Sequence, residues 1–195
     1  MFADTGGPYD RNTPCPRLER IHIARISPEV SLLSFPLEDL LGEMRAQHFG
    51  ELSRGVTIHF VREGSLACID SSQERAAIYV HALLNHPETP VEIMRFICKH
   101  ELLHLVVPPR EINGKMVSHT PEFFQREATI SPESTDVWIW LIVHFHGCLR
   151  RRWKEEKTDV LRTWKKYMNS RRLTLLEARN IIKPEQVVEA EEWSL

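Results

Sequence analysis

HELLHLVVPPREINGKMVSHTPEFF, residues 100–124, places three histidines and a glutamate in a spacing typical of a metal site. His100 and His104 stand four residues apart, Glu101 directly follows the first of them, and His119 comes later in the stretch. A His-Glu-x-x-His pentamer can also occur by chance in a chain that contains 10 histidines. The elements that flank the pentamer therefore have to decide whether these residues bind a metal.

A helix is predicted around the first two histidines. Thr89-Pro90-Val91-Glu92 places a capping threonine before a proline at the first helical position, with a glutamate three residues after the cap. Pro108 and Pro109 end the helix. Between these limits one stripe of the helix surface carries residues spaced by three and four positions, namely Ile93, Ile97, His100 and His104.

Two imidazoles one helical turn apart can bind one ion, each about 2 Å from its ring nitrogen. A catalytic zinc keeps one coordination position open, so a third protein ligand has to come from outside the helix. We expect His119 to be that ligand, because the double proline and the Asn113-Gly114 turn let the chain return before a new helix starts at Thr120-Pro121-Glu122. Glu122 and Glu127 remain alternative third ligands.

Glu101 projects about 100° around the helix from His100, where it can hold a zinc-bound water without being a ligand itself. Zinc lowers the pKa of such a water toward ~7, and a carboxylate can take its proton during attack on a carbonyl carbon. The pattern therefore predicts a zinc-dependent metallopeptidase, a hydrolase whose substrate is a peptide or a protein.

At this point the sequence resembles a known family. HELLH followed by SHTPEF (residues 118–123), with GELSRGVTIHFV (residues 50–61) ahead of it, is similar to SprT-like and YgjP-like zinc metallopeptidases, which are relatives of the Spartan proteases. The resemblance covers roughly residues 35–130. It implies a minimal zincin fold that holds one Zn²⁺ per chain through His100, His104 and His119, with Glu101 as general base. The chain departs from the family in its longer loop between the second and third histidines and in lacking the zinc ribbon of many members.

The fold class that we predict is α+β, a zincin-like minimal metallopeptidase domain with a small antiparallel or mixed sheet and an active-site helix. The expected helix over residues 37–49 is followed by Gly50, and the three strands form a meander over residues 56–61, 66–70 and 76–83. A further start signal at Ser131-Pro132-Glu133 opens an apolar helix over residues 136–149, which a long basic helix over residues 150–169 follows. The expected units are a flexible N-terminal arm (1–20), a SprT-like zincin domain (21–130) and an α-helical C-terminal extension (131–195).

Basic residues are concentrated near the C-terminus, although the net charge of the chain is −2. Residues 149–172 contain ten basic and three acidic side chains. One interpretation is a helix with a solvated basic face and an apolar stripe formed by Trp153, Val160, Leu161, Trp164 and Tyr167. The alternative is a DNA-binding surface, for which the candidate contacts are Arg150, Arg151, Arg152, Lys165 and Lys166.

Four other histidines are expected to have structural roles. His59 and His81 fall in predicted strands and are expected to be packing or sheet-face residues. The alternative is that His81 or Tyr79 faces the cleft and stabilises an oxyanion. Neither belongs to the predicted catalytic set. His144 and His146 flank an apolar helix and are expected in the core or at its boundary.

Composition favours a cytoplasmic protein with no membrane partner. The strongly apolar run over residues 137–143 is far shorter than the ~20 residues of a membrane span, and MFADTGGPYDRNTPCPR does not resemble a secretory signal. The cysteines lack a Cys-x-x-Cys pair, so four reduced thiols are expected at Cys15, Cys68, Cys98 and Cys148. A second functional hypothesis is a nucleic-acid-associated binding protein with a structural or inactive zinc site.

Overall fold

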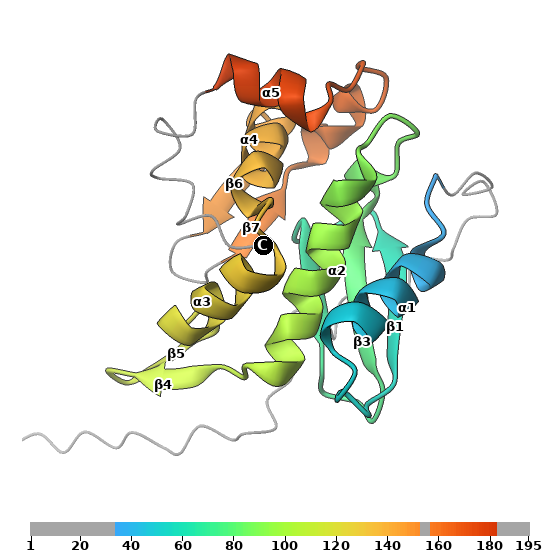
Figure 1. Ribbon diagram of the computed structural model, residues 1–195. Coiled ribbons are helices and arrows are strands. Elements are labelled where there is room, and N and C mark those ends of the chain that lie inside the picture. The colour runs from blue at the N-terminus through green and yellow to red at the C-terminus, as the bar shows by residue number, and fades with distance from the viewer. Residues whose placement is uncertain (1–33, 153–156, 183–195) are drawn as a thin grey trace, which may run out of the picture.

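The computed structural model describes residues 34–152 and 157–182, which form an α+β fold (Figure 1). The predicted N-terminal arm, with Cys15, lies outside the described residues. In chain order the elements are α1 (Leu37–His48), β1 (Val56–Val61), β2 (Ala67–Asp70), β3 (Ala76–His81), η2 (Ala82–Leu84), α2 (Val91–Val106), β4 (Arg110–Ile112), β5 (Lys115–Val117), α3 (Pro121–Ile130), α4 (Ser134–Phe145), β6 (Leu149–Arg152), β7 (Lys157–Val160), η4 (Arg162–Tyr167) and α5 (Leu175–Ile181).

The main sheet is mixed and has the strand order β1-β3-β2. β1 pairs with β3 in parallel, with Ile58 opposite Ile78, whereas β2 pairs with β3 antiparallel. The predicted meander is therefore wrong, because a meander would place β2 between β1 and β3. The central position goes to β3, whose apolar residues Ala76, Ile78 and Val80 have no exposed surface and are best covered there.

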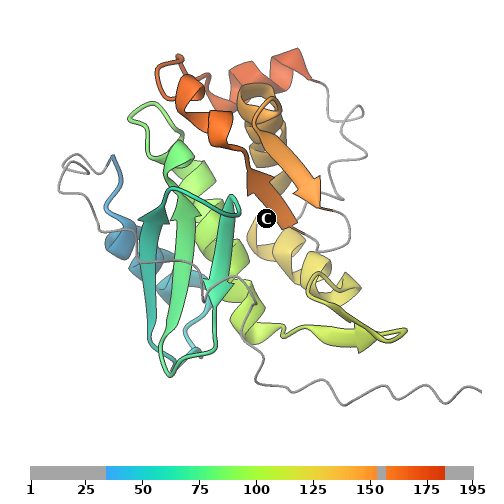
Figure 2. The ribbon, with the colours of Figure 1, turned by 180° about the vertical axis from the view of Figure 1, so that it is seen from behind.

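Helices α1 and α2 both cover one face of this sheet, in front of it in Figure 1 and behind it in Figure 2. α2 runs through the hydrophobic core and has buried side chains on most of its surface. Pro90 is the residue before its first helical position and has ψ of 135°, so the helix begins one residue later than expected. Thr89 consequently makes no capping bond, and its hydroxyl is buried without a hydrogen-bond partner among the described residues.

Strands replace the first half of the long basic helix predicted over residues 150–169, so that prediction is wrong. β6 and β7 form an antiparallel hairpin, and the 3-10 helix η4 follows. The backbone of β7 also pairs with the segment before β2, since Leu66 N donates to Thr158 O at 2.9 Å and Val160 N donates to Gly64 O at 3.0 Å. This pairing outweighs the local preference for helix. Trp164 of η4 is buried, while Trp153 lies outside the described residues.

α4 spans Ser134–Phe145 rather than residues 136–149, and Ser131 ends α3 instead of starting the next helix. The hydrophobic core runs without interruption from α1 and α2 into α4, where Ile139, Trp140 and Leu141 are fully buried. Within residues 34–152 and 157–182, every helix is too short or too polar to cross a bilayer.

Candidate metal centre

Three histidine rings converge beside α2. His100 and His104 lie one turn apart on that helix, and His119 lies on the segment between β5 and α3. One ring nitrogen from each of the three lies within 4.8 Å of the others, and the Nε2 atoms of His100 and His119 are 3.2 Å apart. Two nitrogens bound tetrahedrally to one ion at 2.0–2.1 Å would be about 3.4 Å apart. The three side chains are therefore close enough to bind one metal ion.

A hairpin returns the chain to α2 after the second histidine. β4 and β5 pair with Ile112 opposite Lys115, and the two residues at the tip, Asn113 (φ 54°) and Gly114 (φ 77°), both have positive φ. Two left-handed residues are what the tightest hairpin turn requires, and Asn-Gly is its preferred sequence. The predicted reversal at this dipeptide is confirmed.

α3 forms the wall that faces the rings. Thr120 caps the helix by accepting a hydrogen bond from Phe123 N at 3.3 Å, and Pro121 occupies the first turn, as predicted. Phe123 is fully buried, and the centroid of its ring lies 5.1, 4.6 and 4.9 Å from those of His100, His104 and His119, respectively. The cap fixes where α3 begins and hence where this phenylalanine packs.

The two glutamates considered as alternative third ligands lie outside the ligand group, which consists of the three histidines. Glu122 is exposed and pairs with Arg110 at 2.6 Å, which ties the base of the hairpin to α3. Glu127 is buried, and its Oε1 lies 2.5 Å from Nδ1 of His100, on the other ring nitrogen from the one that faces His119. Sequence reasoning did not predict this contact, although the four-residue spacing from Phe123 places Glu127 on the same buried face of α3.

Burial sets the electrostatics of the rings. Desolvation, and then the proximity of His100 and His119, lowers the pKa of His104 to about 2. His104 is therefore neutral near pH 7, which is the protonation state that a metal ligand needs. Burial also acts to lower the pKa of His100, but the negative charge of Glu127 and its hydrogen bond outweigh burial, and the pKa of His100 is raised.

Glu101 is also buried, with 2% of its surface exposed, and lies on α2 next to His100. The charge of Glu101 affects the pKa values of neighbouring groups. Burial raises the pKa of the Cys98 thiol to about 12, with Glu101 as a smaller second cause, and Glu101 also contributes to the raised pKa of His100. A buried carboxylate is stabilised by a nearby cation.

The other candidate histidines have the contacts expected for packing. His81 is fully buried, accepts a hydrogen bond from Leu83 N through Nδ1 at 3.0 Å, and meets the Trp164 ring edge-on at 4.9 Å. Tyr79 alternates with the buried residues of β3 and therefore faces away from α2, beside His59 of β1.

His144 and His146 differ in burial. His144 is half-buried and accepts a hydrogen bond from Leu173 N through Nε2 at 3.0 Å, as a boundary histidine would. His146 is exposed. Neither takes part in the three-histidine group.

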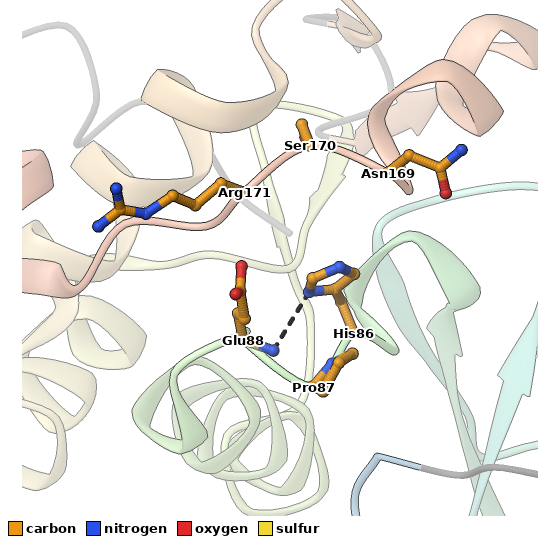
Figure 3. Close-up of a pocket in the computed structure, with 6 residues that line it drawn as sticks. All are labelled: His86, Pro87, Glu88, Asn169, Ser170 and Arg171. Carbon is orange, nitrogen blue, oxygen red and sulfur yellow. Dashed lines mark hydrogen bonds between the residues drawn. The ribbon is translucent and has the colours of Figure 1, made fainter.

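A separate pocket of about 450 Å³ lies between the loop before α2 and the loop after η4 (Figure 3). In it, Glu88 N donates to Nδ1 of His86 at 3.2 Å. The residues that line it are His86, Pro87, Glu88, Asn169, Ser170 and Arg171. None of them is a candidate ligand, and no motif in the sequence points to this pocket.

The candidate nucleic-acid contacts are spread over two kinds of element. Arg150 is an exposed residue of β6, and Lys165 and Lys166 are exposed on η4. The side chains of Arg151 and Arg152 lie outside the described part of the structure. Because the predicted helix is absent, these residues do not share one helical face.

Protein-family models, curated protein sequences and solved structures all give no match to this chain.

Proposed function

We propose that the protein is a zinc-dependent metallopeptidase with a zincin-like domain. The observation that carries this proposal is the convergence of His100, His104 and His119 within 4.8 Å, next to the buried carboxylate of Glu101. Three imidazoles are a ligand set typical of catalytic zinc, which leaves one position for water or substrate. Imidazole ligands also suit other transition metals, so zinc follows from ligand type and from the family resemblance.

In the proposed reaction, zinc would supply an acidified water and a Lewis acid for the scissile carbonyl. The carboxylate of Glu101 would accept the proton from the attacking water and later deliver it to the leaving amide nitrogen. The histidines would hold the geometry as neutral ligands, and for His104 the low pKa supports this state. Phe123 would exclude water from the inner side of the rings, since it packs against all three.

The arrangement of the sheet supports a peptide as the substrate. β2 is an edge strand, antiparallel to the rest of the sheet, and it contacts α2. The segment just before β2 is paired with β7, through Ser65 and Leu66. Within residues 34–152 and 157–182, Ala67–Asp70 pairs with β3 alone. An extended peptide could add to this edge through main-chain hydrogen bonds.

Replacement of Glu101 by Gln tests the chemistry. The variant should retain zinc but cleave an unfolded protein such as casein about 10²–10⁴-fold more slowly, because the proton acceptor is lost. His119→Ala should bind zinc weakly, whereas His146→Ala, which changes an exposed histidine outside the cluster, should match the wild type. Elemental analysis measures the zinc content of each variant, and a cleavage assay measures its activity. Undiminished cleavage by Glu101→Gln, or unchanged zinc content in His119→Ala, would refute the proposal.

A nucleic-acid-binding function is the second candidate, and exposed basic residues around η4 favour it. They are Arg162, Lys165, Lys166 and Arg171. If they contact phosphates, affinity for DNA should fall steeply with added salt, and the double change Lys165→Ala, Lys166→Ala should reduce the slope by about two. Glu101→Gln should leave this binding unchanged. Absence of binding at low salt would exclude this function.

A further inference from the structure

Two adjacent buried side chains of α2 reach across to α3 and to the start of α4. Lys99 Nζ donates to Ile130 O at 2.8 Å and pairs with the Glu133 carboxylate at 2.5 Å. His100 pairs through Nδ1 with Glu127 at 2.5 Å. The exposed fractions of His100 and Glu127 are 2% and 8%, so their contact is shielded from water. The Lys99 contact is less shielded, because 27% of the Glu133 side chain is exposed. One contact involves a candidate ligand and the other does not.

The contact with Glu127 selects which nitrogen of His100 is available to a metal. A carboxylate only accepts hydrogen bonds, so Nδ1 must carry the proton and donate to Glu127. In the neutral ring this leaves the lone pair on Nε2. Nε2 is the atom that lies 3.2 Å from Nε2 of His119. When the ring is neutral, the bond therefore directs the unprotonated Nε2 of His100 toward the other candidate ligands.

We propose that Glu127 is a positioning residue for the metal centre, which fixes the orientation and tautomer of His100 and makes its Nε2 a better ligand. This rests on the proposed metal site. Without Glu127, the ring could rotate or carry its proton on Nε2, and either change would remove a ligand. An anionic partner on the far nitrogen also increases the basicity of a ligating imidazole. A buried carboxylate is costly unless paired, and here its partner is the ligand ring itself.

The neighbouring ion pair provides a matched control. Glu127 and Glu133 accept hydrogen bonds from two consecutive residues of α2. Glu127 connects α2 to α3, and Glu133 connects α2 to the start of α4. Glu133, however, contacts Lys99 rather than a candidate ligand. If Glu127 only held the helices together, removal of either carboxylate would affect metal binding alike. If it positions His100, removal of Glu127 alone would weaken the metal site.

The experiment compares the full-length wild type with Glu127→Ala, Glu127→Gln and Glu133→Ala. Each protein is stripped of metal and titrated with Zn²⁺ against a chromophoric chelator, and the visible absorption of the Co²⁺-loaded form reports ligand geometry. Glu127→Ala should weaken Zn²⁺ binding about 10–100-fold. Glu127→Gln should give an intermediate loss, because its amide oxygen still accepts from Nδ1 but carries no charge. Glu133→Ala should bind Zn²⁺ as the wild type does.

A double variant isolates the route of the effect. In a His100→Ala background, Glu127→Ala should cause little further loss of Zn²⁺ affinity, because the group that it positions is absent. Wild-type affinity in both Glu127 variants, or equal losses in Glu127→Ala and Glu133→Ala, would overturn the positioning role while leaving the metal site intact. A wild type that binds no Zn²⁺ would instead overturn the proposed function and this inference with it. Should Glu127→Ala fail to fold, the near-isosteric Glu127→Gln decides.

Discussion

Acid should destabilise the protein through His81, which is fully buried in the core and has no part in the proposed reaction. Burial lowers its pKa from 6.5 to about 4. The unfolded chain therefore binds a proton on this ring at a higher pH than the folded chain does. It follows that the contribution of His81 to the free energy of unfolding is fully present above pH 6.5 and declines as the pH falls toward 4. Each pH unit in this interval removes about 1.4 kcal/mol, so the whole interval removes about 3 kcal/mol.

His81→Asn tests this reasoning. Asparagine can still accept the hydrogen bond from Leu83 N that caps η2, but it does not titrate. Urea unfolding of both proteins at several values between pH 7 and pH 4, with a chelator present, gives the two stability profiles. Between pH 7 and pH 4, the free energy of unfolding of the variant should fall by about 3 kcal/mol less than that of the wild type. This difference does not depend on the stability of the variant at pH 7. Parallel profiles would refute the argument, because the other histidines titrate equally in both proteins.

Two further predictions concern the core around the metal centre. Phe123→Ala should lower the free energy of unfolding by about 3–5 kcal/mol, since it removes a fully buried ring, and should also weaken metal binding; urea unfolding and metal titration measure the two effects, and Phe123→Leu should be milder in both. Cys98, whose pKa burial raises to about 12, should resist thiol reagents in the folded protein and react on unfolding. Rapid labelling of Cys98 under native conditions, read by mass spectrometry of its peptide, would contradict its burial.

Two elements that local signals specify were predicted correctly, whereas the caps expected at Thr89 and Ser131 were wrong. The Thr120-Pro121 start of α3 and the Asn113-Gly114 turn were predicted correctly, because each depends on the chemistry of a few adjacent residues. The i, i+4 spacing of His100 and His104 likewise follows from helix geometry alone. Their meeting with His119 does not follow from helix geometry and was expected from the intervening turn and from the family resemblance.

Features that depend on distant partners were missed. The residues of β6 and β7 have a helix-compatible composition, and what makes them strands is the pairing of Thr158 and Val160 with the segment before β2. The order of the main sheet depends on which strand is best buried, which periodicity does not reveal. The role of Glu127 was missed for the same reason, because its partner His100 is 27 residues away. In each case the deciding contact is tertiary.

Because of the β4–β5 hairpin, the number of residues between His104 and His119 can change without moving the two histidines apart. The two strands of the hairpin are antiparallel, so they bring residue 119 back to α2, and extra residues at the tip would not change this return. Doubling the length of a flexible loop adds only about 0.6 kcal/mol of closure entropy. Insertions at Asn113-Gly114 could therefore reshape the surface next to the rings while the ligand geometry is conserved, and a fixed spacing would be a poor criterion for finding proteins built in this way.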